Sequence, residues 1–149
     1  MINKEEQKFK GHFKIEVFDK NMNLKESKEV DNLIVTVGKT FLATWLAAGS
    51  QSNAFMPGTA IGTGTNAPTT GDTTLQTEVA RVSNTASSST NVFQTVATFN
   101  PGVGTGAITE AGMLSSSVSG GTMFARQVFS VVNKGSADTL QITWQITFS

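Results

Sequence analysis

The middle of this chain contains few side chains that could do acid–base or metal chemistry. Between Thr40 and Asn133 only five residues are charged, whereas ordinary soluble domains carry about a quarter charged residues. The five are Asp72, Glu78, Arg81, Glu110 and Arg126. The whole chain has one histidine and no cysteine, which excludes disulfides, thiolate metal sites and multi-histidine metal sites. No catalytic signature is found, so we expect neither enzymatic activity nor a cofactor.

Two of the five charged residues, Glu78 and Glu110, could be the carboxylate pair of a glycoside hydrolase. That chemistry needs two carboxylates roughly 5 to 9 Å apart across a cleft lined with aromatic side chains. Trp45 and Trp144 instead stand in apolar patterns that are typical of a core. We therefore favour a structural role, in which each glutamate pairs with one of the two arginines or accepts N–H groups from glycine loops.

Three further motifs also favour structure over chemistry. Gly62-Thr63-Gly64 follows a predicted strand, but it lacks the remainder of a phosphate-binding motif and is predicted to be a turn. Asp72 is expected to cap a short turn, because no regular spacing of oxygen ligands for calcium surrounds it. His12 is expected at a surface or an interface. The five charged residues are thus predicted to be structural pins, meaning charged side chains that fix loops.

Charge is divided unevenly along the chain. Fifteen of the 22 charged residues fall in the first 39 positions, and the net charge is zero. A neutral chain is not expected to attract nucleic acid or anionic lipid over long range, and no apolar run approaches the roughly 18 residues of a membrane span. We therefore expect neither nucleic acid nor membrane as a partner.

The length of 149 residues fits one domain with a real core. Residues 1–10 are polar and are predicted to be a flexible N-terminal arm, and residues 11–149 are predicted to be a single domain. Alternation over residues 12–18 and a charged return over residues 24–30 predict a first hairpin. Residues 83–90, with the sequence SNTASSST, are predicted to be a polar connector. Further strands are predicted near residues 59–61, 92–99, 108–114 and 122–132, and residues 75–82 are predicted to form one helical turn and then a strand.

One helix is predicted near residues 37–48. Phe41, Trp45 and Ala48 fall at positions i, i+4 and i+7, which places them on one face of a helix. Thr36 could cap the start of this helix, and Gly49 could end it. We expect Phe41 and Trp45 to be core anchors; the alternative is that Trp45 faces a subunit contact.

The last segment has the clearest pattern, because apolar and polar residues alternate without interruption to its end. The apolar face is predicted to be buried as a row of core anchors. Strands separated by turn signals, with one helix, predict a mainly β protein, an antiparallel β-sandwich that is jelly-roll-like. The predicted core anchors of the last strand are Leu140, Ile142, Trp144, Ile146 and Phe148.

The glycine-flanked charges resemble a recurring series in the N-terminal domain of phage tail-collar and tail-fibre proteins, written G-x-G, P, L-x-x-E-x-x-R and I-x-E-x-G-L. The match from Leu75 to Arg81 has full spacing, and Met113 stands where leucine is usual. The opening, from residue 13 to residue 49, is similar to small phage virion proteins. The residues that carry the series are Ile61, Gly62, Thr63, Gly64, Pro68, Leu75, Glu78, Arg81, Ile108, Glu110, Gly112, Met113 and Leu114.

The resemblance implies a virion component that is assembled in the host cytoplasm. Tail-collar proteins usually continue into a long fibre domain, whereas this chain stops at Ser149, directly after a predicted core strand. We therefore expect a capsid decoration or cement protein that forms a homo-oligomer, a trimer by expectation, and binds the major capsid protein. A tail, collar or fibre adaptor that binds neighbouring tail proteins is the first alternative, and a carbohydrate-binding module is a remote one.

Overall fold

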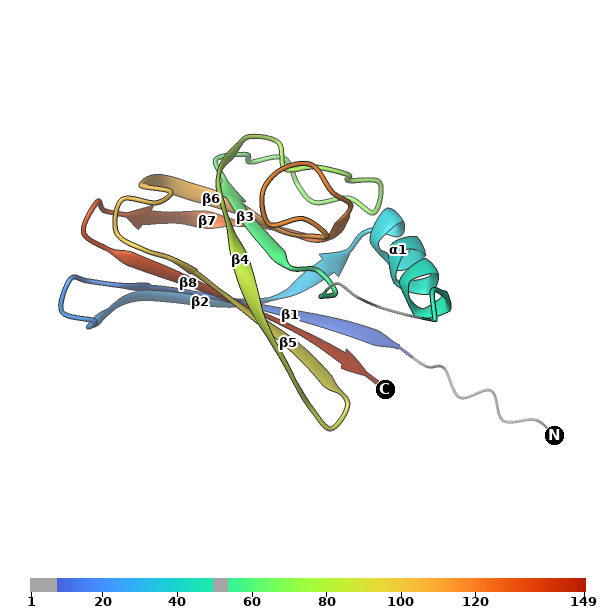
Figure 1. Cartoon of the computed structure of the whole chain (residues 1–149). Coiled ribbons are helices and arrows are strands. Elements are labelled where there is room, and N and C mark those ends of the chain that lie inside the picture. The colour runs from blue at the N-terminus through green and yellow to red at the C-terminus, as the bar shows by residue number, and fades with distance from the viewer. Residues whose placement is uncertain (1–7, 50–53) are drawn as a thin grey trace.

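The described part of the chain folds into a closed antiparallel barrel of eight strands with one helix (Figure 1). The structure, a computed structural model, describes residues 8–49 and 54–149. Strands neighbour one another in the order β1-β2-β7-β6-β3-β4-β5-β8, and β8 closes the ring on β1. The elements are β1 (Phe9–Phe18), β2 (Leu24–Ile34), α1 (Thr36–Ala47), β3 (Gly58–Gly62), β4 (Glu78–Ser89), β5 (Val92–Phe99), β6 (Gly106–Leu114), β7 (Met123–Lys134) and β8 (Thr139–Phe148).

The mainly β, antiparallel character and the single helix are confirmed, but the jelly-roll-like sandwich is not. Two strands, β4 and β2, each pair with one neighbour along the first part of their length and with a different neighbour along the rest. The first half of β4 pairs with β3 and its second half, from Asn84, pairs with β5. Strand β2 pairs with β1 along most of its length and then with β7 at Leu33 and Ile34. Figure 1 shows β4 crossing between the two layers of strands. Because β4 and β2 each pair with two neighbours in this way, the strands form one continuous ring.

The barrel begins earlier in the chain than the predicted arm allowed. Phe9 and Lys10 belong to β1 and pair with Phe148 and Thr147 of β8, so the prediction that the arm extends to residue 10 is wrong. The rings of Phe9 and Phe148 meet edge to face, with centroids 5.2 Å apart. This contact and the ladder to β8 account for the earlier start. Residues 1–7 of the predicted arm lie outside the described residues.

The predicted polar connector at residues 83–90 is also wrong. Residues up to Ser89 are the second half of β4, which pairs with β5 from Asn84↔Ala97 to Ser89↔Val92. Serine and threonine are neutral and tolerate strands, so the backbone ladder to β5 decides the conformation here. Thr90, with φ of +53°, makes the turn into β5.

Helix α1 begins one residue before its predicted start and ends one residue before its predicted end. Thr36 is its first residue and not its cap; the cap position is Val35, which makes no side-chain capping bond. The Thr36 N–H donates instead to the carbonyl of Thr70, 2.8 Å away. Gly49, just beyond the helix, adopts φ of +69°, a left-handed conformation that favours glycine and commonly ends helices.

Only one side of α1 reaches the core. Gly38 and Leu42 are its buried residues. The predicted anchors Phe41 and Trp45 are half-buried, and both rings pack against the ring of Phe55, at centroid distances of 6.0 and 5.2 Å. The helix therefore packs along one end of the barrel, with Trp45 at the margin of the core.

The core lies inside the barrel, and the inward faces of β1 and β8 contribute to it together with residues of α1 and of other strands. Leu140, Ile142, Trp144 and Ile146 are buried. Phe148 is 39% exposed, so its prediction as a core anchor is wrong; it lies at the last position of β8, where the barrel ends. The indole N–H of Trp144 donates to Thr59 Oγ1, 3.1 Å away, which satisfies the polar atom of this buried ring. No helix in the described part of the chain has the length and apolar character to cross a membrane.

Candidate functional site

The most buried charged contact joins β6 to β7. Glu110 is fully buried and Arg126 is 2% exposed. The Nε and Nη2 atoms of Arg126 both donate to Glu110 Oε2, at 3.1 and 2.9 Å. The strand register places Arg126 opposite Gly112, two positions along β6 from Glu110. The two side chains thus share one face of neighbouring strands, a consequence of the period of two along a strand.

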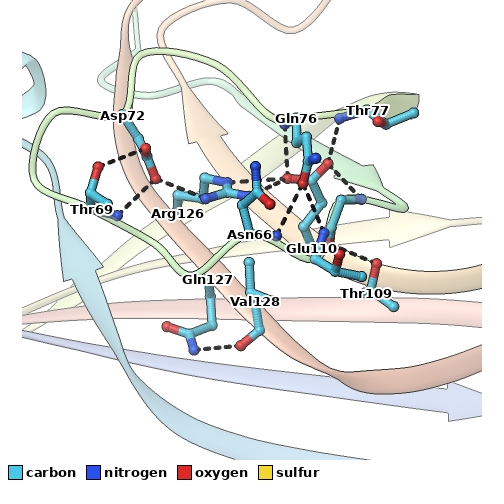
Figure 2. Close-up of polar contacts among 12 residues, drawn as sticks. Asn66, Thr69, Asp72, Gln76, Thr77, Thr109, Glu110, Arg126, Gln127 and Val128 are labelled. Carbon is cyan, nitrogen blue, oxygen red and sulfur yellow. Dashed lines mark hydrogen bonds and ion pairs between the residues drawn. The ribbon is translucent and has the colours of Figure 1, made fainter.

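Glu110 also accepts three backbone N–H groups from the loop between β3 and β4. Oε1 accepts from Gly64 at 3.0 Å and from Thr77 at 2.7 Å, and Oε2 accepts from Gln76 at 3.0 Å. Gly64 opens the loop, whereas Gln76 and Thr77 close it. One carboxylate therefore holds both ends of the loop of residues 63–77 (Figure 2).

Asp72 fixes the middle of the same loop. Its Oδ2 accepts from Arg126 Nη1 at 2.8 Å, and its two oxygens accept from the N–H and the hydroxyl of Thr69 at 3.0 and 2.9 Å. Figure 2 shows the guanidinium of Arg126 between the carboxylates of Asp72 and Glu110. Asp72 accepts the N–H of Thr69, which precedes it in the chain, whereas a cap of the predicted kind accepts N–H groups from the residues that follow it. We call Asp72, Glu110 and Arg126 the buried network.

Both carboxylates of the buried network are held in the ionised form. Burial alone would raise the pKa of Glu110, but the N–H groups of Thr77 and Gln76, the Arg126 guanidinium and the Gly64 N–H outweigh it and lower that pKa below its usual value. Burial likewise opposes ionisation of Asp72, and bonds from Thr69 and Arg126 lower its pKa. The charges of the network therefore persist at neutral pH.

A second network holds the loop between β6 and β7. Arg81 donates from Nε and Nη2 to the two oxygens of Glu78, at 2.9 and 2.7 Å. Its Nη1 donates to the carbonyls of Ser116 and Gly120, at 3.1 and 2.7 Å. The Arg81 side chain is 6% exposed and the Glu78 side chain 35%. We call Glu78 and Arg81 the rim network, since it lies nearer the surface than the buried network.

Glycines make room for these contacts. A Cβ on Gly64 would lie 2.5 Å from Glu110 Oε1, and one on Gly62 would lie 2.6 Å from the same atom. A Cβ on Gly58 would collide with the carbonyl of Ser116. The glycines of this motif are therefore explained by the close approach of backbone and carboxylate.

The arrangement holds loops and offers no reacting group at Glu110. Its two oxygens accept five hydrogen bonds within the chain and have no access to solvent. Glu78 is occupied by Arg81 in the separate rim network. His12 is half-buried on β1, 3.5 Å from Asp31 Oδ1. No group of three or more His, Asp or Glu residues within the described ranges could hold a metal ion.

Sequence reasoning missed several polar residues that hold the structure. Gln76 accepts the N–H groups of Thr65 and Asn66 with its Oε1 atom, at 2.9 and 3.0 Å. Asn84 accepts from Thr59 Oγ1 at 2.7 Å and donates to the carbonyl of Met56 at 2.8 Å. Neither residue is charged, so a search for charged residues in a neutral segment passes over both.

A third charged cluster was also missed, at the turn between β7 and β8. Asp138 accepts from Lys25 Nζ at 2.7 Å and from the Gly135 N–H at 2.8 Å, and these bonds lower its pKa. Lys134 is buried and donates to the carbonyl of Asn100 at 3.1 Å; burial lowers its pKa. Lys134 lies two positions after Val132, which is buried, so the two side chains point to the same face of the strand. This spacing was the signal available in the sequence.

Comparisons with known proteins give no relative to this chain: family models, curated proteins and solved structures were all searched without a match.

Proposed function

We propose that this protein is a non-enzymatic structural component of a phage virion, a decoration or cement protein that binds the capsid. One observation carries the proposal: all five charged side chains between Thr40 and Asn133 are engaged in contacts within the chain. Glu110 has no access to solvent and therefore cannot meet a substrate in this conformation. These residues instead fix the conformation of two loops.

The surface between those charges is neutral and suits contact with other subunits. The hairpin of β4 and β5 extends from the barrel (Figure 1), and its tip from Thr85 to Asn91 is exposed and rich in serine. Exposed apolar residues such as Leu46, at 63%, and Val118, at 84%, stand in the same neutral part of the chain. Such surface is inexpensive to desolvate compared with a charged one.

Cement acts by burying surface that bridges neighbouring subunits, and a standard specific interface buries about 1,600 Å². We propose that this chain does so as a homo-oligomer, a trimer in the simplest arrangement around a threefold axis of a capsid, with the major capsid protein as its other partner. The virion is then its location, after assembly in the host cytoplasm.

The test uses empty capsids that lack this protein. Adding the purified protein should give saturable co-sedimentation and should raise the temperature at which the capsids dissociate. Bovine serum albumin at the same concentration controls for crowding. Capsids that neither bind the protein nor gain heat resistance would contradict the proposal.

A tail, collar or fibre adaptor is the second candidate. The specific observation is that Glu78, Arg81 and Glu110, which stand in the tail-collar-like series, all fix loops in this structure. Antibody labelling of particles in electron micrographs distinguishes the two, since cement gives label over the head and an adaptor gives label at the tail alone. A carbohydrate-binding module is disfavoured, because Trp144 is buried and Trp45 lines a groove whose described lining residues are all apolar.

A further inference from the structure

The second half of β4, residues 84–89, forms one edge of a sheet of five strands. Strands β2, β1, β8, β5 and this half of β4 pair in that order. On the side away from β5, β4 pairs with β3 only as far as Ser83, opposite Gly58. The pairing with β5 instead continues from Asn84 to Ser89, in the hairpin that extends from the barrel (Figure 1). No strand that the structure describes therefore pairs with the outer side of residues 84–89, which we call the β4 edge.

The free main-chain groups of the β4 edge belong to Ala86 and Ser88. The N–H of Asn84 points away from β5, because it donates to the carbonyl of Pro57, 2.7 Å away. Main-chain groups point alternately to the two sides of a strand, and the pairing with β5 runs here without a register shift. Ala86 and Ser88 therefore also direct their N–H and C=O groups away from β5, where the described residues offer them no partner.

The β4 edge is fixed in position by its neighbours. Strand β5 pairs with β8 along its whole length. The turn that joins β4 to β5 is also bonded to the end of β8: Asn91 Nδ2 donates to the carbonyl of Phe148 at 2.7 Å, and the Phe148 N–H donates to the carbonyl of Asn91 at 3.0 Å. An edge that is already extended loses little conformational freedom when another strand pairs with it.

The opposite edge of the same sheet differs from the β4 edge in charge. It is β2, whose outer side pairs with β7 only at Leu33 and Ile34. Five of the eight residues from 24 to 31 are charged, and charged side chains, above all lysine, hinder the pairing of one edge with another. The β4 edge has the sequence NTASSS, without charge or proline, and its ladder to β5 has no bulge. One edge is therefore protected against pairing, whereas the other is open to it.

A second copy of the β4 edge fits these features. Two identical antiparallel strands are related by a two-fold axis, so that each presents the same surface to the other. Like charges directly opposite destabilise a strand pair, and the neutral β4 edge brings none together. If the two Ser87 residues lie opposite each other, Ala86 of each copy faces Ser88 of the other. Each of these pairs then exchanges two N–H···O bonds, so this register uses all the free groups of Ala86 and Ser88.

We propose that the β4 edge joins two copies of this chain by antiparallel strand pairing, with the two Ser87 residues at the two-fold axis. The sheet then continues from one copy into the other. The inference goes beyond the proposed function, because it adds a contact in pairs to the threefold contact proposed above and needs no capsid. A chain that assembles without this edge would overturn the inference and leave capsid binding to its own test.

The test measures hydrogen exchange at the main-chain N–H groups of the purified, ¹⁵N-labelled full chain at millimolar concentration by NMR. The N–H groups of Ala86 and Ser88 should exchange slowly, because they are bonded to the second copy. Those of Thr85 and Ser87 point toward β5 and are the internal reference, since their protection needs no second copy. Exchange of Ala86 and Ser88 at the rate of an unstructured peptide, with Thr85 and Ser87 protected, would overturn the proposal.

Three variants connect this protection to the pairing of two copies. Ser87→Lys places two positive charges opposite each other and should weaken the pairing about fivefold or more, so that Ala86 and Ser88 exchange faster. Ser119→Lys, the same change at an exposed residue between β6 and β7, should leave their exchange as in the native chain. An equimolar mixture of Ser87→Lys and Ser87→Glu should restore slow exchange, because opposite charges then meet at the axis.

The mixture also separates pairing from folding, because mixing cannot repair a variant that fails to fold. Melting temperatures of Ser87→Lys and Ser87→Glu close to that of the native chain confirm that both are folded. Two results with these folded variants would contradict the proposal: unchanged exchange of Ala86 and Ser88 in Ser87→Lys, and no recovery in the mixture. The measurement on the native chain decides the question without any variant.

Discussion

Arg126 and Glu110 meet through a single carboxylate oxygen: both Nε and Nη2 of the guanidinium lie within 3.1 Å of Oε2. The other oxygen, Oε1, accepts N–H groups from Gly64 and Thr77. One side of the carboxylate therefore binds β7, and the other binds the two ends of a loop. The third nitrogen of Arg126 reaches Asp72, in the middle of that loop. Two neighbouring strands thus determine the course of a loop whose bonded residues lie 33 to 54 positions away in sequence from Glu110 or Arg126.

Removing Glu110 should be strongly destabilising. Glu110→Ala leaves Arg126 buried without this partner and leaves three backbone N–H groups unpaired, so we expect the free energy of unfolding to fall by about 3–5 kcal/mol. Urea denaturation followed by tryptophan fluorescence measures it. Glu29→Ala, at a carboxylate whose side chain is 55% exposed, is the matched control and should change stability by about 0.5 kcal/mol or less. Equal losses in the two variants would contradict the role of the buried network.

The buried network should make the protein sensitive to acid. The folded-state pKa values of Glu110 and Asp72 lie below their usual values, so the unfolded chain binds more protons at low pH. Their contribution is fully present above the unfolded values of about 4.3 for Glu and about 3.9 for Asp, and it is lost as pH falls through the lower folded values. Unfolding free energies measured from pH 7 downward should therefore decrease more steeply for the native chain than for Glu110→Gln. Parallel curves would count against this account.

The rim network predicts unequal effects of its two members. Arg81 binds two backbone carbonyls in addition to Glu78, and its side chain is 6% exposed against 35% for Glu78. We expect Arg81→Ala to cost about 2–4 kcal/mol and Glu78→Ala about 1 kcal/mol. Hydrogen exchange should accelerate in the loop of residues 115–121 in Arg81→Ala, with the loop of residues 63–77 unchanged. A larger loss in Glu78→Ala than in Arg81→Ala would be the opposite result.

Gly64 should not tolerate a side chain. A Cβ there would lie 2.5 Å from Glu110 Oε1, so Gly64→Ala must displace the carboxylate or the loop, at about 1–3 kcal/mol. Gly71, in the same loop, is the control: the nearest atom to its Cβ would be Thr69 Oγ1 at 3.9 Å. Thermal unfolding should give a clearly lower melting temperature for Gly64→Ala and little change for Gly71→Ala. Equal melting temperatures would show that the close approach is unimportant.

Part of this fold is predictable because local pattern and tertiary structure agree. The alternation of residues 140–146 corresponds to a strand with one face fully buried. The pairing of Glu110 with an arginine and with N–H groups of a glycine loop follows from the cost of burying a charge without partners. Both inferences rest on the residues themselves and need no knowledge of distant neighbours.

The remainder depends on partners far along the chain. The ring closes through the pairs Leu33↔Arg126 and Ile34↔Ala125, which no local pattern indicates. The serine-rich half of β4 is a strand because β5 pairs with it. Phe148 continues the alternation perfectly and is still 39% exposed, because alternation predicts which face a residue shares but not where the barrel ends.

The central claim is that this protein decorates the capsid, and its location in the particle tests that most directly. In the phage that the proposal requires, heads and tails can be separated, and the copy number of this protein in each fraction can be measured by quantitative mass spectrometry. The account predicts that it is in the head fraction, at a copy number comparable with that of the major capsid protein. Recovery in the tail fraction alone, at a few copies per particle, would contradict it.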